Sequence, residues 1–405
     1  MRIALAALTI ALMLTGCGGT VDGTATKGST PTADPSALDP GSYPTSPRPP
    51  LGPAGTDEVG QLVEGRRMAG FVVGPWQVDP TLSQVGSAPA KVVTHRNQIS
   101  QVVWPSMMSR FPALPLVTGF VSERTSTEPN DPTLVRNAVL QYPFPRTAEL
   151  AAQGLADGAL NIVVTDAGGG PVPTEPVRAV PIPSHPDATG ALITHNEGGA
   201  IMHDLTVVSA HGPYMLIQVV QFATPERAAE LAGRVLDLQV PLIDTFVPTA
   251  PTPLATLPRD PSSLLARTVP LKPGQGDSMS DADYDPPGAT QLEHNPIQAG
   301  AAMQDAGVDT VAISQTTVYQ ARDPEAAQRL AQALADDIAQ TRVSQPAEGV
   351  PGIAGSRCVR TEDAGGLTSQ HWCIATFERF TFKAVARELD SAHQQTAAQY
   401  LMLSR

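Results

Sequence analysis

From residue 56 onward, the order of apolar and polar positions predicts helices and strands in a regular alternation. A helix is predicted to start at Thr56 and to run to about Met68, with apolar residues at helical spacing. Four strand-like runs follow, and a helix over Thr147–Ala156 comes after the first of them. The runs are Asn137–Tyr142, Ala191–His195, Ala200–Ser209 and Tyr214–Ala223. Thr224-Pro225-Glu226 then opens another helix, because Thr caps well and Pro fits the first helical position.

The second half of the chain repeats this pattern. It predicts strands at Thr310–Ala321, Cys358–Arg360 and Trp372–Val385, a helix opening at Asp323, and a last helix over Ser391–Leu403. Residues 221–232 can be laid beside residues 320–331, since both read as strand, cap, Pro-Glu and Ala-rich helix. This likeness favours an internal duplication, although any two good helix starts resemble one another.

These patterns predict an α+β protein of two similar domains, each a mainly antiparallel sheet with helices packed on one face. Composition sets the boundaries, because Pro, Gly, Ser and Thr gather before the first domain and between the two. The expected units are a signal peptide at 1–16, a tether at 17–55, domains at 56–247 and 273–405, and a linker at 248–272.

The first seventeen residues predict where the protein is found. Arg2 precedes an apolar run from Ile3 to Leu14, which is too short to span a bilayer. Leu14-Thr15-Gly16-Cys17 resembles a bacterial lipobox, whose cysteine sulfur carries a diacylglyceryl group. We therefore expect lipid on Cys17 to anchor the protein at the extracytoplasmic face of the cell membrane. The alternative is an ordinary signal peptide with a chance cysteine.

Charge and size limit the possible partners. The chain has 405 residues and a formal net charge of −13, so it should repel nucleic acid and anionic lipid headgroups. Attachment to the membrane is then expected through Cys17 alone. Hydrophobic content of 41% with only 4% aromatic residues predicts cores built from aliphatic side chains. Trp76, Trp104, Phe111 and Phe120 are expected in the core rather than in a pocket.

The two remaining cysteines, Cys358 and Cys373, are expected to form a disulfide in an oxidising compartment. If Gly365 and Gly366 form a hairpin turn, the two cysteines fall directly opposite one another. Directly opposed strand residues are within disulfide range. Without a C-x-x-C motif, the bond is expected to be structural rather than redox-active.

Candidate catalytic and metal-binding residues are few. His195, His203 and His211 recur every eight residues near Asp204, but the predicted turns place them in solvent, where they would form no metal site. If the protein were a hydrolase, these histidines near Asp204 would be its candidate catalytic residues. The chain carries no nucleophile elbow, phosphate loop or zinc-protease motif. No cofactor or metal is therefore expected.

An acidic run contains Asp277, Asp281, Asp283 and Asp285. Its last three members match the first ligands of a calcium-binding loop. Pro286 stands where that loop requires Gly, and Leu292 stands where it requires Glu. We therefore predict a solvated loop.

Four stretches resemble a family of two-domain cell-envelope lipoproteins of mycobacteria and related actinobacteria whose function is unknown. They are Leu38–Arg48 (LDPGSYPTSPR), Glu64–Ala69 (EGRRMA), Trp372-Cys373 and Thr396–Tyr400 (TAAQY). The resemblance implies two domains and an envelope location. It implies no catalytic role for any residue.

The leading functional hypothesis is a non-enzymatic lipoprotein that binds a small molecule, a lipid or another envelope component. Two alternatives stay open at this point. One is an envelope hydrolase whose site has no recognised motif, and the other is a sensor or assembly module that binds protein partners.

Overall fold

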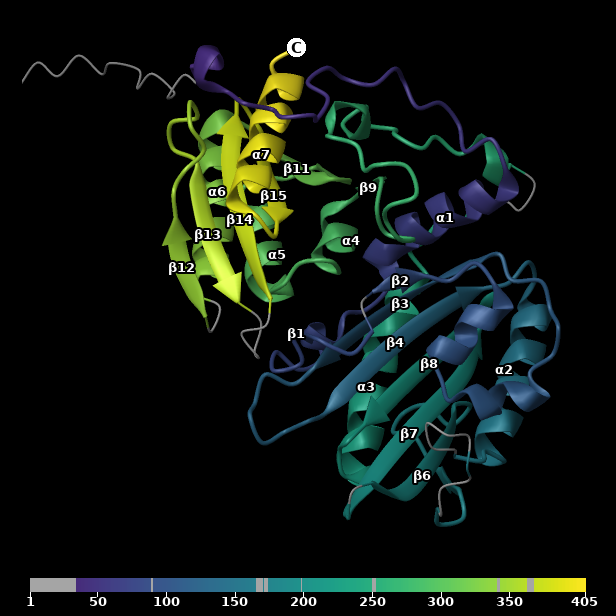
Figure 1. Ribbon diagram of the computed structural model, residues 1–405. Coiled ribbons are helices and arrows are strands. Elements are labelled where there is room, and N and C mark those ends of the chain that lie inside the picture. Colours follow the sequence, from purple (N-terminus) through teal and green to yellow (C-terminus); the bar gives the residue numbers. More distant parts are fainter. Residues whose placement is uncertain are drawn as a thin grey trace, which may run out of the picture.

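The computed structural model describes residues 34–88, 90–164, 170, 174–197, 199–249, 253–340, 343–362 and 368–405. The predicted signal peptide, Cys17 and the first part of the predicted tether lie outside these ranges. Within them the chain forms two domains, each with an antiparallel sheet and helices (Figure 1). The predicted α+β class with two similar domains is therefore confirmed.

The first domain contains an eight-stranded sheet in the order β1-β3-β4-β8-β7-β6-β5, with β2 also paired to β3. The strands are β1 (Gln84–Val85), β2 (Lys91–Val92), β3 (Thr118–Thr125), β4 (Leu134–Gln141), β5 (Arg178–Val180), β6 (Thr189–Glu197), β7 (Ala200–His211) and β8 (Tyr214–Gln221). The helices are α1 (Asp57–Met68), α2 (Pro145–Leu160) and α3 (Pro225–Ile243).

The second domain contains a seven-stranded sheet in the order β9-β10-β11-β15-β14-β13-β12. The strands are β9 (Ala282–Tyr284), β10 (Thr310–Ile313), β11 (Thr316–Gln320), β12 (Ser344–Ala347), β13 (Arg357–Glu362), β14 (Ser369–Phe377) and β15 (Phe380–Ala386). The helices are α4 (Pro286–Thr290), α5 (Pro296–Asp305), α6 (Pro324–Ala339) and α7 (Leu389–Leu403).

The two sheets have the same topology. Strands β1, β3, β4, β8, β7, β6 and β5 correspond in order to β9, β10, β11, β15, β14, β13 and β12. Helix α2 then corresponds to α6, and α3 corresponds to α7. The sequence likeness noted above joins different positions, because residues 221–232 enter α3 whereas residues 320–331 enter α6. Topology supports the duplication, and that alignment does not.

Three of the predicted helices start at a residue whose side chain caps the helix. Thr56 Oγ1 accepts a hydrogen bond from the Val59 amide, and Thr224 Oγ1 accepts one from the Arg227 amide. Asp323 caps α6 in the same way. Each cap satisfies a backbone N–H that the first turn of a helix leaves free, so these helix starts follow from local sequence.

Helices cover both faces of each sheet, not one face as predicted. On β4, Val135 and Val139 share a core with α3, whereas Ala138 and Leu140 pack with α2. In the second domain, α6 and α7 likewise lie on opposite faces of the sheet. The reason is visible in β3 and β8, where every residue but the last is buried. A nearly continuous buried run indicates a strand covered on both sides.

One hydrophobic core joins the two domains. It contains Leu231 and Leu236 of α3 together with Met303 of α5 and Leu330 of α6. The domains are therefore held in contact by burial of apolar surface, which stabilises by about 25 cal/mol per Å².

The described parts of the predicted tether and linker, residues 34–55 and 253–272, pack against the rest of the molecule more than their composition suggested. Leu38 and Leu51 pack against the core beneath α7, and the Gln395 amide donates to Tyr43 Oη. Residues 34–55 therefore lie along the second domain before the chain reaches α1 (Figure 1). In the predicted linker, Leu265 and Val269 are fully buried. Both segments are Pro-rich, but their spaced apolar side chains find partners on the second domain.

No helix in the described ranges combines the length and the apolarity needed to cross a membrane.

Helix α2 approaches the 3-10 helix η5 (Pro105–Arg110) closely at Gly158, where an added Cβ would lie 2.0 Å from the Met107 carbonyl oxygen. We expect Gly158→Ala to lower the free energy of unfolding by about 1–3 kcal/mol, because a backbone atom must move. Gly300→Ala in α5 is the matched control, since its Cβ would meet Thr290 at an ordinary 3.4 Å. It should gain up to about 1 kcal/mol of helix propensity. Denaturant unfolding of both variants tests this, and equal effects would contradict it.

Candidate binding sites between the domains

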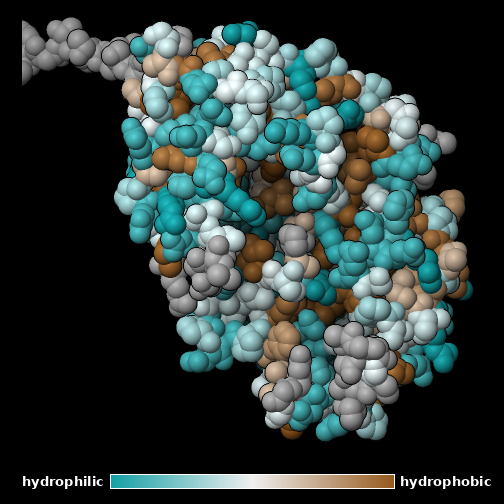
Figure 2. Space-filling view, viewed as in Figure 1, coloured by the Kyte–Doolittle hydropathy of each residue, from teal (hydrophilic) through white to brown (hydrophobic). Residues whose placement is uncertain are grey.

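One hollow is a groove of about 810 Å³ between the two domains. Its first wall comes from the segment after α1, which carries Trp76, and from Leu242 of α3. Its second wall comes from α4 and α5. Its lining contains Gly70, Val72, Trp76, Gln77, Pro80, Leu242, Pro286, Pro287, Thr290, Gln291, Pro296, Ile297, Gly300, Gln304, Gly307 and Val308. None of these side chains is ionisable. Figure 2 shows one face of the molecule, which has a central hollow with apolar side chains inside it.

Trp76 is fixed in place by its neighbours. Gly74 leaves room for the indole, because an added Cβ there would lie 2.2 Å from the ring. The Arg124 guanidinium lies 5.2 Å from the ring centroid, which is a cation–π arrangement. Phe111 and Phe120 are buried as predicted, but Trp76 is only half-buried and lines the groove. The prediction that it belongs to the core was wrong.

Gln291 ties the two walls of the groove together. Its Nε2 donates to the Val72 carbonyl oxygen at 2.7 Å and to that of Ala69 at 3.4 Å, both in the first domain. Its Oε1 has no hydrogen-bond partner among the described residues, and the residue is only 4% exposed. Because these hydrogen bonds connect the two walls, the groove is already formed before a ligand binds.

The next residues along the chain line a second hollow of about 370 Å³, which we call the polar pocket. Glu293 accepts a hydrogen bond from Tyr319 Oη at 2.5 Å and pairs with Lys383 Nζ at 2.6 Å. The Glu293 and Lys383 side chains are 6% and 13% exposed. Burial, and then the charge of Glu293, raises the pKa of Tyr319. The tyrosine therefore stays a neutral donor to the carboxylate.

A third cavity, of about 370 Å³, lies between α1, the segment 257–262 and β9. Asp283 lines it and accepts from Ser262 Oγ at 2.5 Å, while its Oδ1 has no hydrogen-bond partner among the described residues. Burial, together with the charge of nearby Asp260, raises the pKa of Asp283 to about 7. A carboxyl group that holds its proton near neutral pH is a common feature of binding and catalytic sites.

The acidic run is thus not the solvated loop that the sequence predicted. Asp281 pairs with Arg48 and Arg259, each at 3.2 Å. Asp283 belongs to β9, and Asp285 caps α4 by accepting from the Gly288 amide. The charges have partners because the N-terminal segment and the linker pass beside them, which no local pattern reveals.

The three histidines do not converge. His195 lies in β6, is 7% exposed and faces Asp204 at 3.4 Å, with the Trp104 ring edge-on at 6.1 Å. His203 bonds to Thr194 and His211 pairs with Asp244 at 2.6 Å. The prediction of a solvated turn histidine was wrong for His195, because the β6–β7 hairpin extends beyond it.

The buried His195–Asp204 pair offers little to a hydrolase. Neither His195 Nε2 nor Asp204 Oδ1 has a hydrogen-bond partner among the described residues. Burial raises the pKa of Asp204, against the lowering effects of Gln221 and His195. His195 of β6 and Asp204 of β7 are both buried, so a substrate in solvent would not reach them, and neither of the other two histidines lies beside the pair.

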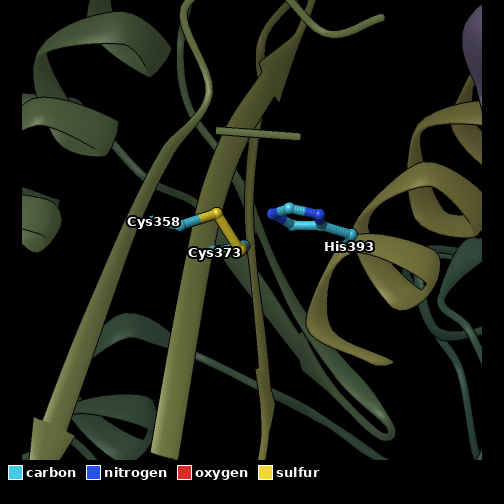
Figure 3. A group of neighbouring side chains, drawn as sticks. All are labelled: Cys358, Cys373 and His393. Atoms are coloured by element: carbon cyan, nitrogen blue, oxygen red, sulfur yellow. A yellow bond between two sulfur atoms is a disulfide. The ribbon is translucent and has the colours of Figure 1, made fainter. Parts of the chain in front are cut away.

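The predicted disulfide is confirmed. Cys358 of β13 lies directly opposite Cys373 of β14, and the two are bonded with their Cα atoms 4.2 Å apart. The predicted Gly365–Gly366 turn lies outside the described residues. Figure 3 shows His393 of α7 beside the bond, and its ligand atom and the two sulfurs lie within 4.8 Å of one another. Because the sulfurs are bonded to each other, neither is a thiolate that could hold a metal.

Sequence reasoning missed all three hollows. Their walls come from residues more than 150 positions apart, such as Trp76 and Pro296 in the groove. One signal in the sequence was the clustering of Pro and Gly around residues 286–307. Small residues there let two segments of the chain approach each other closely.

Fold and cavities together define a class: a two-domain α+β protein whose domains share one topology and enclose ligand-sized hollows between them. The chain belongs to the DUF7373 family, a family of domains of unknown function. The N-terminal domain of that family matches residues 51–259 and its C-terminal domain matches residues 264–405.

Two solved structures are similar to parts of the chain. The extracellular domain of PknH from Mycobacterium tuberculosis is 14% identical, with 43% of this chain and 94% of that chain covered and a TM-score of 0.30. DynU16, from the dynemicin biosynthetic locus, is 9% identical, with 77% and 94% covered and a TM-score of 0.10. No curated protein matches the chain.

Asp283 should make stability depend on pH. Its pKa in the folded state is about 7, above the value of about 3.9 for an unfolded chain, so its contribution is full below pH 4 and is lost as pH rises through 7. Asp283→Asn keeps an acceptor for Ser262 but removes this titration. Relative to wild type, the variant should gain stability between pH 4 and pH 8, measured as thermal midpoints across pH. Asp309→Asn, at the exposed rim of the cavity, is the control; a parallel gain there would contradict the assignment.

Proposed function

We propose that this protein is a lipid-anchored envelope protein that binds an uncharged small molecule, or the uncharged part of a lipid, in the groove between its domains. The observation that carries the proposal is a groove of about 810 Å³ at the domain interface, lined without any ionisable side chain. Ligand sites are typically hollows of about 300–1,000 Å³, largely apolar, and frequently lie between domains.

The lining indicates why the ligand should be uncharged. A charge moved into a site without a counter-charge or hydrogen-bond partners loses its hydration uncompensated. The groove instead offers prolines, Trp76, Ile297 and the amide groups of Gln77 and Gln304. Such a surface suits an apolar or hydroxyl-bearing molecule. The preformed walls reduce the ordering cost of binding it.

The anchor would be the lipid on Cys17, as the lipobox-like sequence favours. Residues 34–55 run along the second domain, so a tether beginning at Cys17 would lead to that domain first. At about 3.3–3.6 Å per residue, the residues between Cys17 and Asp34 span at most about 60 Å. The second domain would then lie nearer the membrane than the first domain.

A bound molecule should survive gentle purification from the protein's own host and appear as a discrete added mass in native mass spectrometry. Ile297→Lys places a charge in the groove at a side chain that is 41% exposed, so the fold should tolerate it and the added mass should be lost. Ile201→Lys, at a 67% exposed position in β7, is the control and should retain it. Wild-type protein without any added mass, or an added mass kept by Ile297→Lys, would count against the groove.

Cys17→Ser removes the sulfur that would carry the lipid. The variant should leave the membrane fraction and lack the mass of the diacylglyceryl group. A double variant, Cys358→Ala with Cys373→Ala, should stay lipidated, because its cysteines form the disulfide. Membrane retention of Cys17→Ser would refute the anchor.

A further inference from the structure

The polar pocket differs in chemistry from the groove, since half of its lining residues are apolar and the other half are polar, with Glu293, Asp337 and Lys383 among them. Val85 of the first domain and Leu334 and Ile338 of α6 are among its apolar lining residues. Glu293 and Lys383 neutralise each other by their ion pair at 2.6 Å. The carboxylate that remains in the lining is Asp337, with His294 beside it.

Asp337 is buried without a salt bridge. It is 8% exposed, lines the pocket, and forms no ion pair within 4.0 Å with any residue of the described ranges. Its side chain is hydrogen-bonded to Asn295, and His294 lies close enough to influence it. Burial is the main effect on its pKa and raises it, and the charge of Glu293 adds to this, whereas His294, Asn295 and Lys383 lower it. An unpaired carboxylate in such a place is costly unless a cation enters.

An aromatic ring completes the pocket. Trp372 of β14 is half-buried, lines the same space, and is held in orientation by a hydrogen bond from its Nε1 to Thr361 Oγ1 at 3.1 Å. Indole is the best of the aromatic side chains at attracting a cation to its face. Lys383, which also lines the pocket, already makes a cation–π contact of this kind, because its Nζ lies 5.4 Å from the Tyr319 ring centroid.

We infer that the polar pocket binds an organic cation, a small ammonium compound with an apolar body. Its charge would pair with Asp337, and its carbon atoms would pack on Trp372 and the aliphatic walls. A volume of about 370 Å³ is enough for a compact molecule of this kind. An anion is disfavoured, because Lys383 is engaged by Glu293 and Asp337 would repel it. This site is separate from the groove and does not depend on it.

Choline and its uncharged isostere 3,3-dimethylbutan-1-ol test the inference, because they share a shape and differ in charge. The probes are titrated into the purified, folded chain and followed by calorimetry and thermal shift. Choline should bind and raise the melting temperature, and the alcohol should bind at least tenfold more weakly, a difference of about 1.4 kcal/mol.

Asp337→Asn keeps the size of the side chain and its hydrogen bond but removes the charge. It should fold at least as well as wild type, since it removes an unpaired buried charge, and it should lose at least tenfold in choline affinity. Asp336→Asn is the matched control, one residue away on α6, where its partners are Arg357 and Gln332 outside the pocket. It should bind choline as wild type does.

Three outcomes would overturn the inference: equal affinity for choline and the alcohol, no choline binding by the folded protein, or equal losses in the two aspartate variants. The groove variant Ile297→Lys separates this site from the proposed function. It should retain choline binding even where the molecule carried in the groove is lost.

Discussion

Arg124 is a buried cation at the joint between the two domains, where Arg66 of α1 also donates to carbonyl oxygens of the second domain. Arg124 lies on β3 of the first domain, is 3% exposed, and donates to the carbonyl oxygens of Gln291 and Glu293 at 2.8 and 3.0 Å in the second. Its guanidinium also lies over Trp76. Burial lowers the pKa of Arg124 to about 10, which still leaves it charged at neutral pH. The segment that Arg124 holds separates the groove from the polar pocket, so both hollows owe their walls to this contact.

Sharing a topology has not made the two domains chemically alike. Each buries an ion pair of a glutamate with a cation, Glu123 with Arg136 in the first domain and Glu293 with Lys383 in the second. In the first domain, Arg136 also donates to the Val102 carbonyl oxygen. In the second, the ion pair lines an open pocket. The two pairs stand at different positions of the shared topology, on β3 and β4 in the first domain and on the α4–α5 connection and β15 in the second.

Local sequence predicted those features whose causes are local. Thr56 and Asp323 mark helix starts because a cap acts within one turn, and the spacing of Cys358 and Cys373 determined their register through a single hairpin. The hollows could not be predicted in this way, because Trp76 meets Gln291 only after both domains have packed. The same limit explains the error on Asp281, whose partner Arg48 is 233 residues away in the chain.

The path of residues 34–55 also has a consequence for the order in which the molecule is completed. This early segment rests on a part of the chain that is made much later: Gln395 donates to Tyr43, and Ser46 accepts from Arg405 across 359 residues. Contacts of such long sequence separation form late. A chain emerging from its amino end would therefore leave this segment without its docking surface until α7 has followed. Ordering of the region nearest the expected anchor is in this way coupled to the folding of α7.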